Sequence, residues 1–265
     1  MPFQLKATFR EALAGQSRAG DGGRPLAGMW VSSGSPLVAE ICAGSGLDWL
    51  LVDMEHGPNG IEGVLRQLQA TAAYPPSVVV RVPGLLPVTI KQVLDLGAQN
   101  LLVPMIDTAE QAEAAVRAVR YPPRGVRGVG SSLARSARWN RVEDYLAHGD
   151  EHVSLLLQVE SAAGVRNAGE IAAVDGVDGV FVGPSDLAAS MGLIGQPSHP
   201  DVVAAVLHAL ETVRAAGTPA GVNSFDPAQA EAYLAAGASF ALVGADVALL
   251  ARGSEALADR FVARG

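Results

Sequence analysis

The chain has 265 residues, enough for one large hydrophobic core or two small ones. Its 19 basic and 27 acidic residues give a net charge of −8, which argues against a nucleic-acid-binding protein, because such proteins present a basic face. No apolar run approaches the roughly 20 residues of a membrane span, and the N-terminus carries no apolar signal core. A single cysteine, Cys42, cannot form an internal disulfide, so we expect the protein to act in the reducing cytoplasm. From the charge and the lack of a long apolar run, we expect it to associate with neither nucleic acid nor membrane.

Eight short apolar runs bounded by turn residues indicate β-strands. They cover residues 25–31, 48–54, 77–82, 99–105, 153–160, 178–183, 218–223 and 239–244. Nearly every position in these runs is apolar, a pattern typical of parallel strands that are covered on both faces. Helical patterns separate them, at residues 36–46, 61–73, 87–98, 108–120, 163–174, 199–217 and 226–238.

Eight strand–helix units in about 250 residues predict an α/β fold, a TIM (β/α)8 barrel that the whole chain, residues 1–265, forms as a single domain. The alternative is a doubly wound open sheet, but no GxGxxG motif follows the first strand. We expect a helix at 4–14 to cap the bottom of the barrel and residues 15–25 to link it flexibly to the first strand. The long connections at 121–146 and 191–200 are expected to build the active site or an oligomer contact.

Polar or aromatic residues end most of the predicted strands. They are Trp30, Asp53, Glu55, His56, Arg81, Gln158, Glu160, Gly183-Pro184-Ser185-Asp186, Asn223 and Gly244-Ala245-Asp246. In a TIM barrel the chemistry takes place at the carboxyl ends of the strands, so we expect these residues to converge on one mouth.

Two carboxylates in this set, Glu160 and Asp186, come from neighbouring strands. They repel each other unless a cation or a proton lies between them, and hard oxygen ligands suit Mg²⁺ or Mn²⁺. The pattern therefore predicts a divalent metal site, although a solvated or salt-bridged pair remains the alternative.

Three further features of the strand ends suggest a catalytic site. Asp53 next to His56 is typical of an acid–base pair, although a structural histidine bonded to a capping aspartate has the same spacing. Arg81 follows a buried run and calls for an anion, either a substrate carboxylate or enolate or an ion pair with Glu55 or Asp53. The turn Gly183-Pro184-Ser185 precedes a short helix and either holds a carboxylate or is an ordinary turn.

The lysines restrict the possible mechanisms. Only Lys6 and Lys91 occur, and both lie within predicted helices. No lysine ends a strand, so a Schiff-base mechanism has no nucleophile. Carbon–carbon bond chemistry next to a carbonyl in this barrel would need a metal as electron sink.

Five motifs in order carry a family resemblance: GMW…VAEICAGSGLDWLLVDMEHGPN, VRVP, GVRGVGSSLARSARWN, LLQVES and DGVFVGPSDLAASMG. Together they resemble the HpcH/HpaI aldolase family of metal-dependent, class II pyruvate aldolases, and most closely its 4-hydroxy-2-oxoheptanedioate (2,4-dihydroxyhept-2-enedioate) aldolases. The resemblance covers residues 25–260. It implies a phosphoenolpyruvate/pyruvate-type barrel.

The resemblance also implies roles for individual residues. Glu160 and Asp186 match the metal ligands, for Mg²⁺, Mn²⁺ or Co²⁺, and Asp53 and His56 match the acid–base dyad. Arg81 matches the arginine that binds the ketoacid and steadies the enolate. The substrate-binding positions are completed by Trp30, Gln158, Gly183, Pro184, Ser185 and Asn223.

The implied reaction is the reversible cleavage of a 4-hydroxy-2-oxoacid, such as an intermediate of aromatic compound catabolism, to pyruvate and an aldehyde, such as succinic semialdehyde. Hydroxypyruvate is a second possible donor. The family is typically a hexamer, a trimer of dimers with an exchanged C-terminal helix, and residues 244–261 form a suitable amphipathic element. The same segment could instead pack within its own subunit.

The chain departs from the family at Ser185, where alanine is frequent, and at Asn223, where an apolar residue is frequent; the latter leaves the aldehyde open. A citramalyl- or malyl-CoA lyase is the nearest rival, with Arg124, Arg127, Arg135, Arg138 and Arg141 as a basic groove for the coenzyme. A phosphosugar isomerase would need a glycine-rich phosphate loop after the last two strands, which is not evident. A non-catalytic assembly module fits poorly with the polar set at the strand ends.

Overall fold

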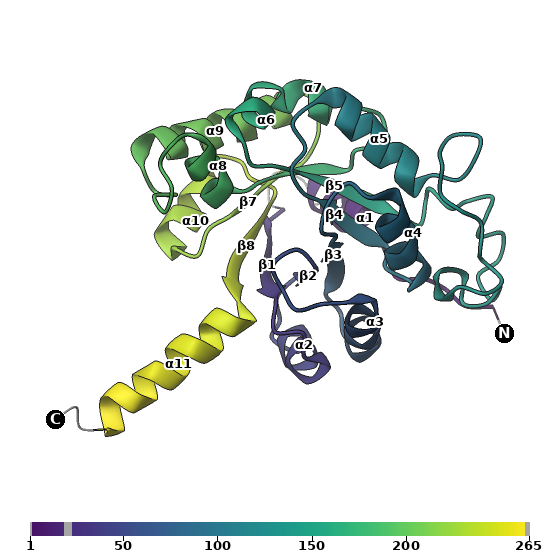
Figure 1. Ribbon diagram of the computed structural model, residues 1–265, viewed down its shortest axis with the longest axis horizontal. Coiled ribbons are helices and arrows are strands. Elements are labelled where there is room, and N and C mark those ends of the chain that lie inside the picture. Colours follow the sequence, from purple (N-terminus) through teal and green to yellow (C-terminus); the bar gives the residue numbers. More distant parts are fainter. Residues whose placement is uncertain (1, 19–22, 263–265) are drawn as a thin grey trace.

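The computed structural model describes residues 2–18 and 23–262, and its eight strands close into a parallel barrel (Figure 1). The strands are β1 (Leu26–Val31), β2 (Trp49–Asp53), β3 (Ser77–Arg81), β4 (Asn100–Val103), β5 (Ser154–Val159), β6 (Gly179–Val182), β7 (Ala220–Asn223) and β8 (Phe240–Ala245). Each strand pairs with the next in the chain, and β8 pairs with β1. The predicted TIM barrel is confirmed, and an open sheet is excluded.

Helices surround the barrel and connect its strands. They are α2 (Pro36–Ala43), α3 (Ile61–Ala70), α4 (Pro87–Asp95), α5 (Ala109–Val119), α6 (Ala162–Arg166), α7 (Ala168–Ala172), α8 (Pro184–Ser190), α9 (Pro200–Ala215) and α10 (Pro227–Ala235). Side chains of Ser35, Thr108 and Asp226 cap α2, α5 and α10. Among the described residues, we find no helix that is both long and apolar enough to cross a bilayer.

The helix predicted at 163–174 was wrong as a single element, because α6 and α7 divide at Asn167. The backbone there leaves the helical region, and the Asn167 carboxamide donates a hydrogen bond to the carbonyl of Asp107, 2.6 Å away. A side-chain bond to a neighbouring loop thus competes with helix continuation.

The N-terminal helix α1 (Phe9–Arg18) starts later than the predicted 4–14. Thr8 sets its start, because the Glu11 carboxylate accepts hydrogen bonds from the Thr8 amide and hydroxyl while the Thr8 hydroxyl accepts from the Glu11 amide. This reciprocal arrangement is a capping box, which fixes the first residue of a helix. Part of the predicted 15–25 linker, residues 19–22, lies outside the described residues.

The N-terminal helix closes the bottom of the barrel as expected. The Phe9 ring is fully buried 5.1 Å from the ring of Trp49 and 5.4 Å from that of Phe240. Gly28 and Gly221 leave space for these rings, since a Cβ at Gly28 would overlap Trp49 and one at Gly221 would overlap Phe240. The lower half of the barrel interior is therefore filled by packed aromatic rings.

The connection between α5 and β5 contains one short helical turn, η1 (Arg135–Ala137). Arg127, which lies earlier in this connection, is fully buried between the rings of Tyr121 and Tyr145. Its guanidinium carbon is 4.5 Å from the centre of the Tyr121 ring. The Arg141 carbonyl accepts a hydrogen bond from the Phe3 amide, so this connection is tied to the N-terminal segment. The arginines of this connection do not form one coenzyme groove, because Arg127 is enclosed.

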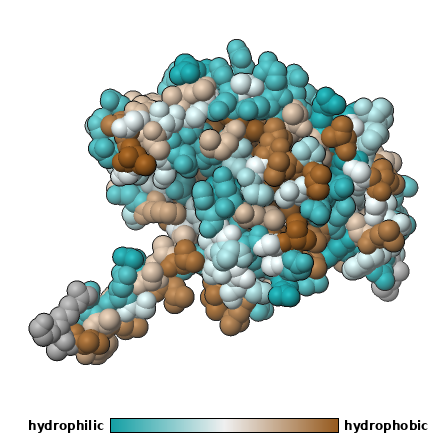
Figure 2. Space-filling model, in the orientation of Figure 1, coloured by the Kyte–Doolittle hydropathy of each residue, from teal (hydrophilic) through white to brown (hydrophobic). Residues whose placement is uncertain are grey.

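The last helix, α11 (Asp246–Phe261), projects away from the barrel (Figures 1 and 2). Its first residue, Asp246, is buried and accepts hydrogen bonds from the amides of Ser32 and Ser33. Beyond that anchor the apolar side chains are exposed: Leu249, Leu250, Leu257 and Phe261. The alternative that this helix packs on its own subunit is therefore not what the structure shows.

Candidate active site

The centre of the candidate site is an ion pair between adjacent strand ends. Asp53 ends β2, Arg81 ends β3, and the two residues are partners in the register of the parallel pair. Arg81 Nε lies 2.8 Å from Asp53 Oδ1, and Arg81 Nη2 lies 2.7 Å from Asp53 Oδ2. Both side chains are buried, so this bidentate pair holds the guanidinium in one orientation.

The aromatic ring of Trp30 and the amide of Asn223 support this guanidinium. The Arg81 guanidinium carbon lies 4.3 Å from the centre of the Trp30 ring, a cation–π contact. The Trp30 indole donates a hydrogen bond of 2.8 Å to Asn223 Oδ1 across the barrel mouth. Four residues from β1, β2, β3 and β7, all predicted as site residues, are thus brought into one connected group.

Glu55, in the loop after β2, adds a second carboxylate beside Arg81. Its Oε2 lies 2.9 Å from Arg81 Nη1, and burial raises the pKa of Glu55, opposed in part by the positive charge of Arg81. The sequence predicts Glu55 at the strand end, with a possible ion pair to Arg81 and no other role. Its position two residues after Asp53, at the end of a buried strand, was the available signal.

Glu160 follows β5 and is buried at the same end of the barrel. Its Oε1 accepts a hydrogen bond of 2.9 Å from the amide of Met105, and its Oε2 accepts one from the Gln158 carboxamide. Burial, together with smaller contributions from the negative charges of Glu55 and Asp186, raises the pKa of Glu160 to about 7. Three carboxylates thus act electrostatically on one another within this mouth.

Asp186 lies in the first turn of α8 and is exposed. The turn before it contains Gly183, where a Cβ would lie 2.9 Å from both Gln158 Nε2 and Glu160 Oε2. Glycine at this position lets the backbone of β6 approach Glu160 closely, so the turn Gly183-Pro184-Ser185 borders the carboxylates. Ser185 is exposed beside it.

His56 lies near this group but is not bonded to Asp53. Both oxygens of Asp53 accept from Arg81, and Oδ1 also accepts from the Glu55 amide. His56 is exposed, and its charge acts on the pKa of Glu55. The expectation that Asp53 orients the His56 ring is therefore not what the structure shows, because Arg81 occupies that carboxylate.

The mouth offers oxygen ligands that suit a divalent cation. Among the described residues, no three His, Cys, Asp or Glu side chains converge into a complete metal site. Glu160 and Asp186 influence each other electrostatically, however, and the Oε1 atom of Gln158 is buried without a hydrogen-bond partner in the described chain. A set of carboxylate and amide oxygens left open for substrate and water matches the preferences of Mg²⁺ and Mn²⁺.

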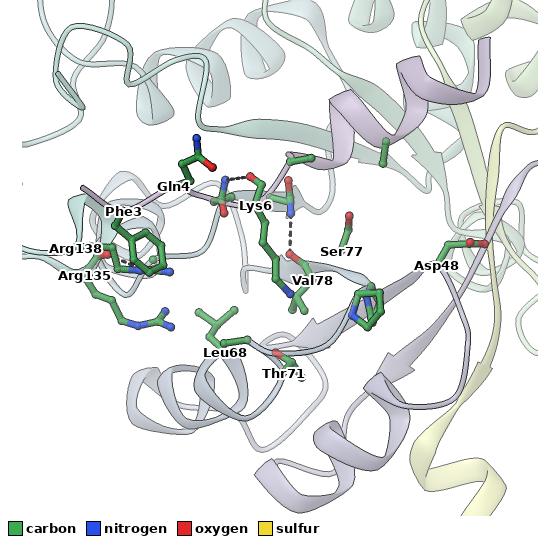
Figure 3. Close-up of a pocket in the computed structure, with 18 of the residues that line it drawn as sticks. Phe3, Gln4, Lys6, Asp48, Leu68, Thr71, Ser77, Val78, Arg135 and Arg138 are labelled. Atoms are coloured by element: carbon green, nitrogen blue, oxygen red, sulfur yellow. Dashed lines mark hydrogen bonds between the residues drawn. The ribbon is translucent and has the colours of Figure 1, made fainter. Parts of the chain in front are cut away.

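Neither lysine reaches this mouth. Lys91 is on the outer helix α4, and Lys6 lies before α1, in a pocket at the opposite end of the barrel (Figure 3). The predicted placement of Lys6 in a helix was wrong, but the absence of a lysine at the strand ends is confirmed for the described residues.

Comparison with known proteins gives the family. The sequence model described as HpcH/HpaI aldolase/citrate lyase matches residues 26–253. The chain belongs to this family. Its members are lyases, so the protein is an enzyme of the aldolase/citrate lyase type.

Individual relatives of this HpcH/HpaI protein are similar over nearly their whole length. The hydroxypyruvate/pyruvate aldolase of Deinococcus radiodurans is 54% identical, over 97% of this chain and 90% of its own. The 4-hydroxy-2-oxo-heptane-1,7-dioate aldolase of Salmonella dublin is 49% identical, over 97% and 95%. A crystal structure of a family protein from Burkholderia cenocepacia has a TM-score of 0.88 at 42% identity, covering 94% of this chain and 99% of the other.

Proposed function

We propose that this HpcH/HpaI protein is a divalent-cation-dependent aldolase that reversibly cleaves a 4-hydroxy-2-oxoacid to pyruvate and an aldehyde. One observation carries the proposal: the fixed guanidinium of Arg81 and the carboxylates of Glu160 and Asp186 belong to the same barrel mouth. A fixed positive charge beside oxygen ligands is what a developing enolate needs. The names of the two relatives support the substrate class, 4-hydroxy-2-oxoheptanedioate with hydroxypyruvate as a second donor.

Glu160 and Asp186 would hold the cation, Mg²⁺, Mn²⁺ or Co²⁺, and the unpartnered, buried amide oxygen of Gln158 would be a further ligand. When bound, the cation supplies Lewis acidity toward the oxygens of the oxoacid. The raised pKa of Glu160 supports this assignment, because a bound cation would offset both its main cause, burial of the carboxylate, and the lesser repulsion by Glu55 and Asp186.

Arg81 would stabilise the charge that develops on the substrate. Its guanidinium has five N–H groups, of which Asp53 accepts two and Glu55 lies beside a third nitrogen. The remaining donors would bind the C2 oxygen of the oxoacid. Because Asp53 and Trp30 fix the guanidinium in advance, no reorganisation is needed as that oxygen becomes negative.

The proton transfer we assign to His56. It would accept the proton of the 4-hydroxyl, the C3–C4 bond would break to release the aldehyde, and the electron pair would form the enolate of pyruvate. Protonation at C3 then gives pyruvate. The structure leaves the His56 ring exposed and unbonded by Asp53, so the ring is accessible to a bound substrate.

The carboxylate of the oxoacid we assign to the turn Gly183-Pro184-Ser185, whose backbone lies against Glu160. Asn223 ends the adjacent strand β7 and is bonded to Trp30, and its amide would face the aldehyde portion. A polar group there favours a hydroxylated or short aldehyde over an apolar one. A coenzyme A thioester is the second candidate, but enclosure of Arg127 removes a member of the groove that it would need.

The exposed helix α11 supports an oligomer. We infer that the helices of two copies exchange, each covering its partner, and that such dimers assemble into a hexamer. The exposed apolar side chains of α11 need cover that their own barrel does not give. The buried, unpaired Cys42 is consistent with action in the reducing cytoplasm.

A pyruvate-release assay over a panel of 4-hydroxy-2-oxoacids tests this function. The panel should include the heptanedioate, a shorter hydroxylated analogue and a coenzyme A thioester of citramalate. We expect turnover of the free acids and none of the thioester. Turnover of the thioester alone would replace this proposal with the rival lyase.

A further inference from the structure

A pocket lies at the opposite end of the barrel from the strand-end mouth (Figure 3). It has a volume of about 710 Å³, and its walls come from the N-terminal segment, the amino ends of β3 and β4 and the η1 connection. Cavities of this size hold small organic ligands. None of the residues assigned to the aldolase reaction lines it.

Three cationic side chains line this bottom pocket: Lys6, Arg135 and Arg138. In Figure 3, Arg135 and Arg138 lie beside Phe3 at one end, and Lys6 extends into the middle. Asp48 is the one carboxylate among the described lining residues, and it forms a bidentate ion pair with Arg24, with distances of 2.6 and 2.7 Å. The pocket therefore carries an excess of positive charge in a chain whose net charge is −8.

The two arginines converge without an acidic partner. A Cβ built on Gly97 would lie 2.6 Å from Arg138 Nη1 and 2.8 Å from Arg135 Nη1, so both nitrogens border one point. Arg135 donates to the Leu96 carbonyl and Arg138 to the Arg135 carbonyl, and no carboxylate of the described chain pairs with either. Burial and the neighbouring charge of Arg138 lower the pKa of Arg135 to about 10.

Such a pair is costly unless an anion lies between its members. Two half-buried guanidiniums repel each other, and most of their N–H groups remain available as donors. Arginine forks match the oxygens of phosphate and carboxylate groups, which neutralise the pair and accept these donors at once. The rest of the lining combines polar side chains with an apolar part formed by Leu26, Leu68, Pro75, Pro76 and Val78.

We propose that the bottom pocket is a binding site for a small organic anion, whose phosphate or carboxylate group lies between Arg135 and Arg138. Lys6 contributes a third positive charge, and the organic part of the ligand lies along Leu68 and Pro75. A doubly charged group is favoured, because it neutralises both guanidiniums. This site is separate from the aldolase mouth, so the proposal does not depend on the proposed reaction.

Isothermal titration calorimetry of the full chain tests the site with three probes. Phenyl phosphate carries two charges and an apolar ring, inorganic phosphate lacks the ring, and benzoate lacks the second charge. We expect saturable binding that is tightest for phenyl phosphate and is not displaced by pyruvate. Tighter binding of benzoate would make the ligand a carboxylate rather than a phosphate.

Two variants and their matched controls locate the binding. Arg138→Gln and Lys6→Glu should each weaken phenyl phosphate roughly tenfold or more. Arg141→Gln, which removes an exposed arginine of the same connection, and Lys91→Glu, which changes the other lysine, should leave it within about twofold. Lys6 is at the surface, so its variant remains informative if Arg138→Gln unfolds.

Three results would overturn the proposal: no saturable binding of any probe, binding that both pocket variants retain, or displacement by pyruvate, which would move the site to the strand-end mouth. Pyruvate release by the variants serves as a check of folding. If that activity is absent in every form while binding follows the pattern above, the aldolase proposal fails and the anion site stands.

Discussion

Asp53 and Arg81 are partners in the register of β2 and β3, and their side chains form a buried bidentate ion pair. The register places both side chains on the same face at the same height of the barrel. The pair therefore requires little distortion, and it fixes the guanidinium that Trp30 covers from the other side.

Removal of the Asp53 charge should therefore affect both stability and turnover. Asp53→Asn leaves the buried Arg81 with one carboxylate fewer, and we predict a loss of about 3 kcal/mol in the free energy of unfolding. We also predict a kcat at least roughly 100-fold lower, because Arg81 is no longer held toward the substrate. Urea titration and a pyruvate-release assay measure the two effects.

Asp175→Asn is the matched control for this prediction, since Asp175 forms an exposed pair with Arg120. Exposed pairs contribute little to stability, so this variant should behave as the parent does. Equal effects of the two substitutions would contradict the role assigned to Asp53.

The bond between Trp30 and Asn223 gives a second prediction. Asn223→Leu leaves the indole N–H without its acceptor, and we predict a loss of about 1–3 kcal/mol in unfolding free energy together with a raised KM for the oxoacid. In a Trp30→Phe background the same substitution should cost much less, because no N–H remains to be satisfied. If the unfolding free-energy changes of the two single variants simply add in the double variant, Trp30 and Asn223 are not coupled and the prediction is wrong.

Tyr233 gives a prediction about alkaline stability. Its hydroxyl is buried without a hydrogen-bond partner in the described chain, and burial raises the pKa of Tyr233 to about 12. An unfolded chain ionises this tyrosine near pH 10, so the folded state loses stability as pH rises from 10 toward 12. We predict that Tyr233→Phe removes this loss and is more stable than the parent by roughly 1 kcal/mol at pH 11. Urea midpoints at pH 8 and pH 11 measure the difference, and a constant difference would refute the assignment.

Because the apolar face of α11 is exposed, we predict that the protein needs this helix to form its oligomer. Leu250→Glu with Leu257→Glu places two charges on it, and we predict a smaller particle by light scattering after size-exclusion chromatography. Leu207→Glu, a partly exposed leucine of α9, is the control and should leave the mass unchanged. A mass unaffected by the double substitution would argue against exchange of α11.

Much of this architecture could be predicted from the sequence. The eight apolar runs predicted the eight strands, because a parallel strand that is covered on both faces has few polar positions. Residues that interrupt these runs, such as Arg81 and Glu160, were predicted to meet at one mouth, and their electrostatic contacts agree. The position of a residue along its strand depends on nearby residues alone, so it can be predicted from the sequence.

Which side chains pair with one another was harder to predict, because such pairs depend on the register of the strands and on side-chain direction. Asp53 was paired with His56 by proximity in the chain, whereas the register of β2 and β3 gives it Arg81 instead. The bottom pocket was not predicted at all, since it brings Lys6 into one cavity with Arg135 and Arg138, which follow it by about 130 residues in the sequence. The start of α1 was misplaced because the capping role of Thr8 was overlooked.

Pyruvate release after exhaustive chelation and re-addition of Mg²⁺, Mn²⁺ or Co²⁺ tests whether Glu160 and Asp186 hold a cation that cleavage needs. We predict that chelation abolishes turnover and that re-addition restores it in the parent and in the exposed-acid control Glu170→Gln, but not in Glu160→Gln or Asp186→Asn. Full turnover by chelated protein, or by either site variant, would contradict it.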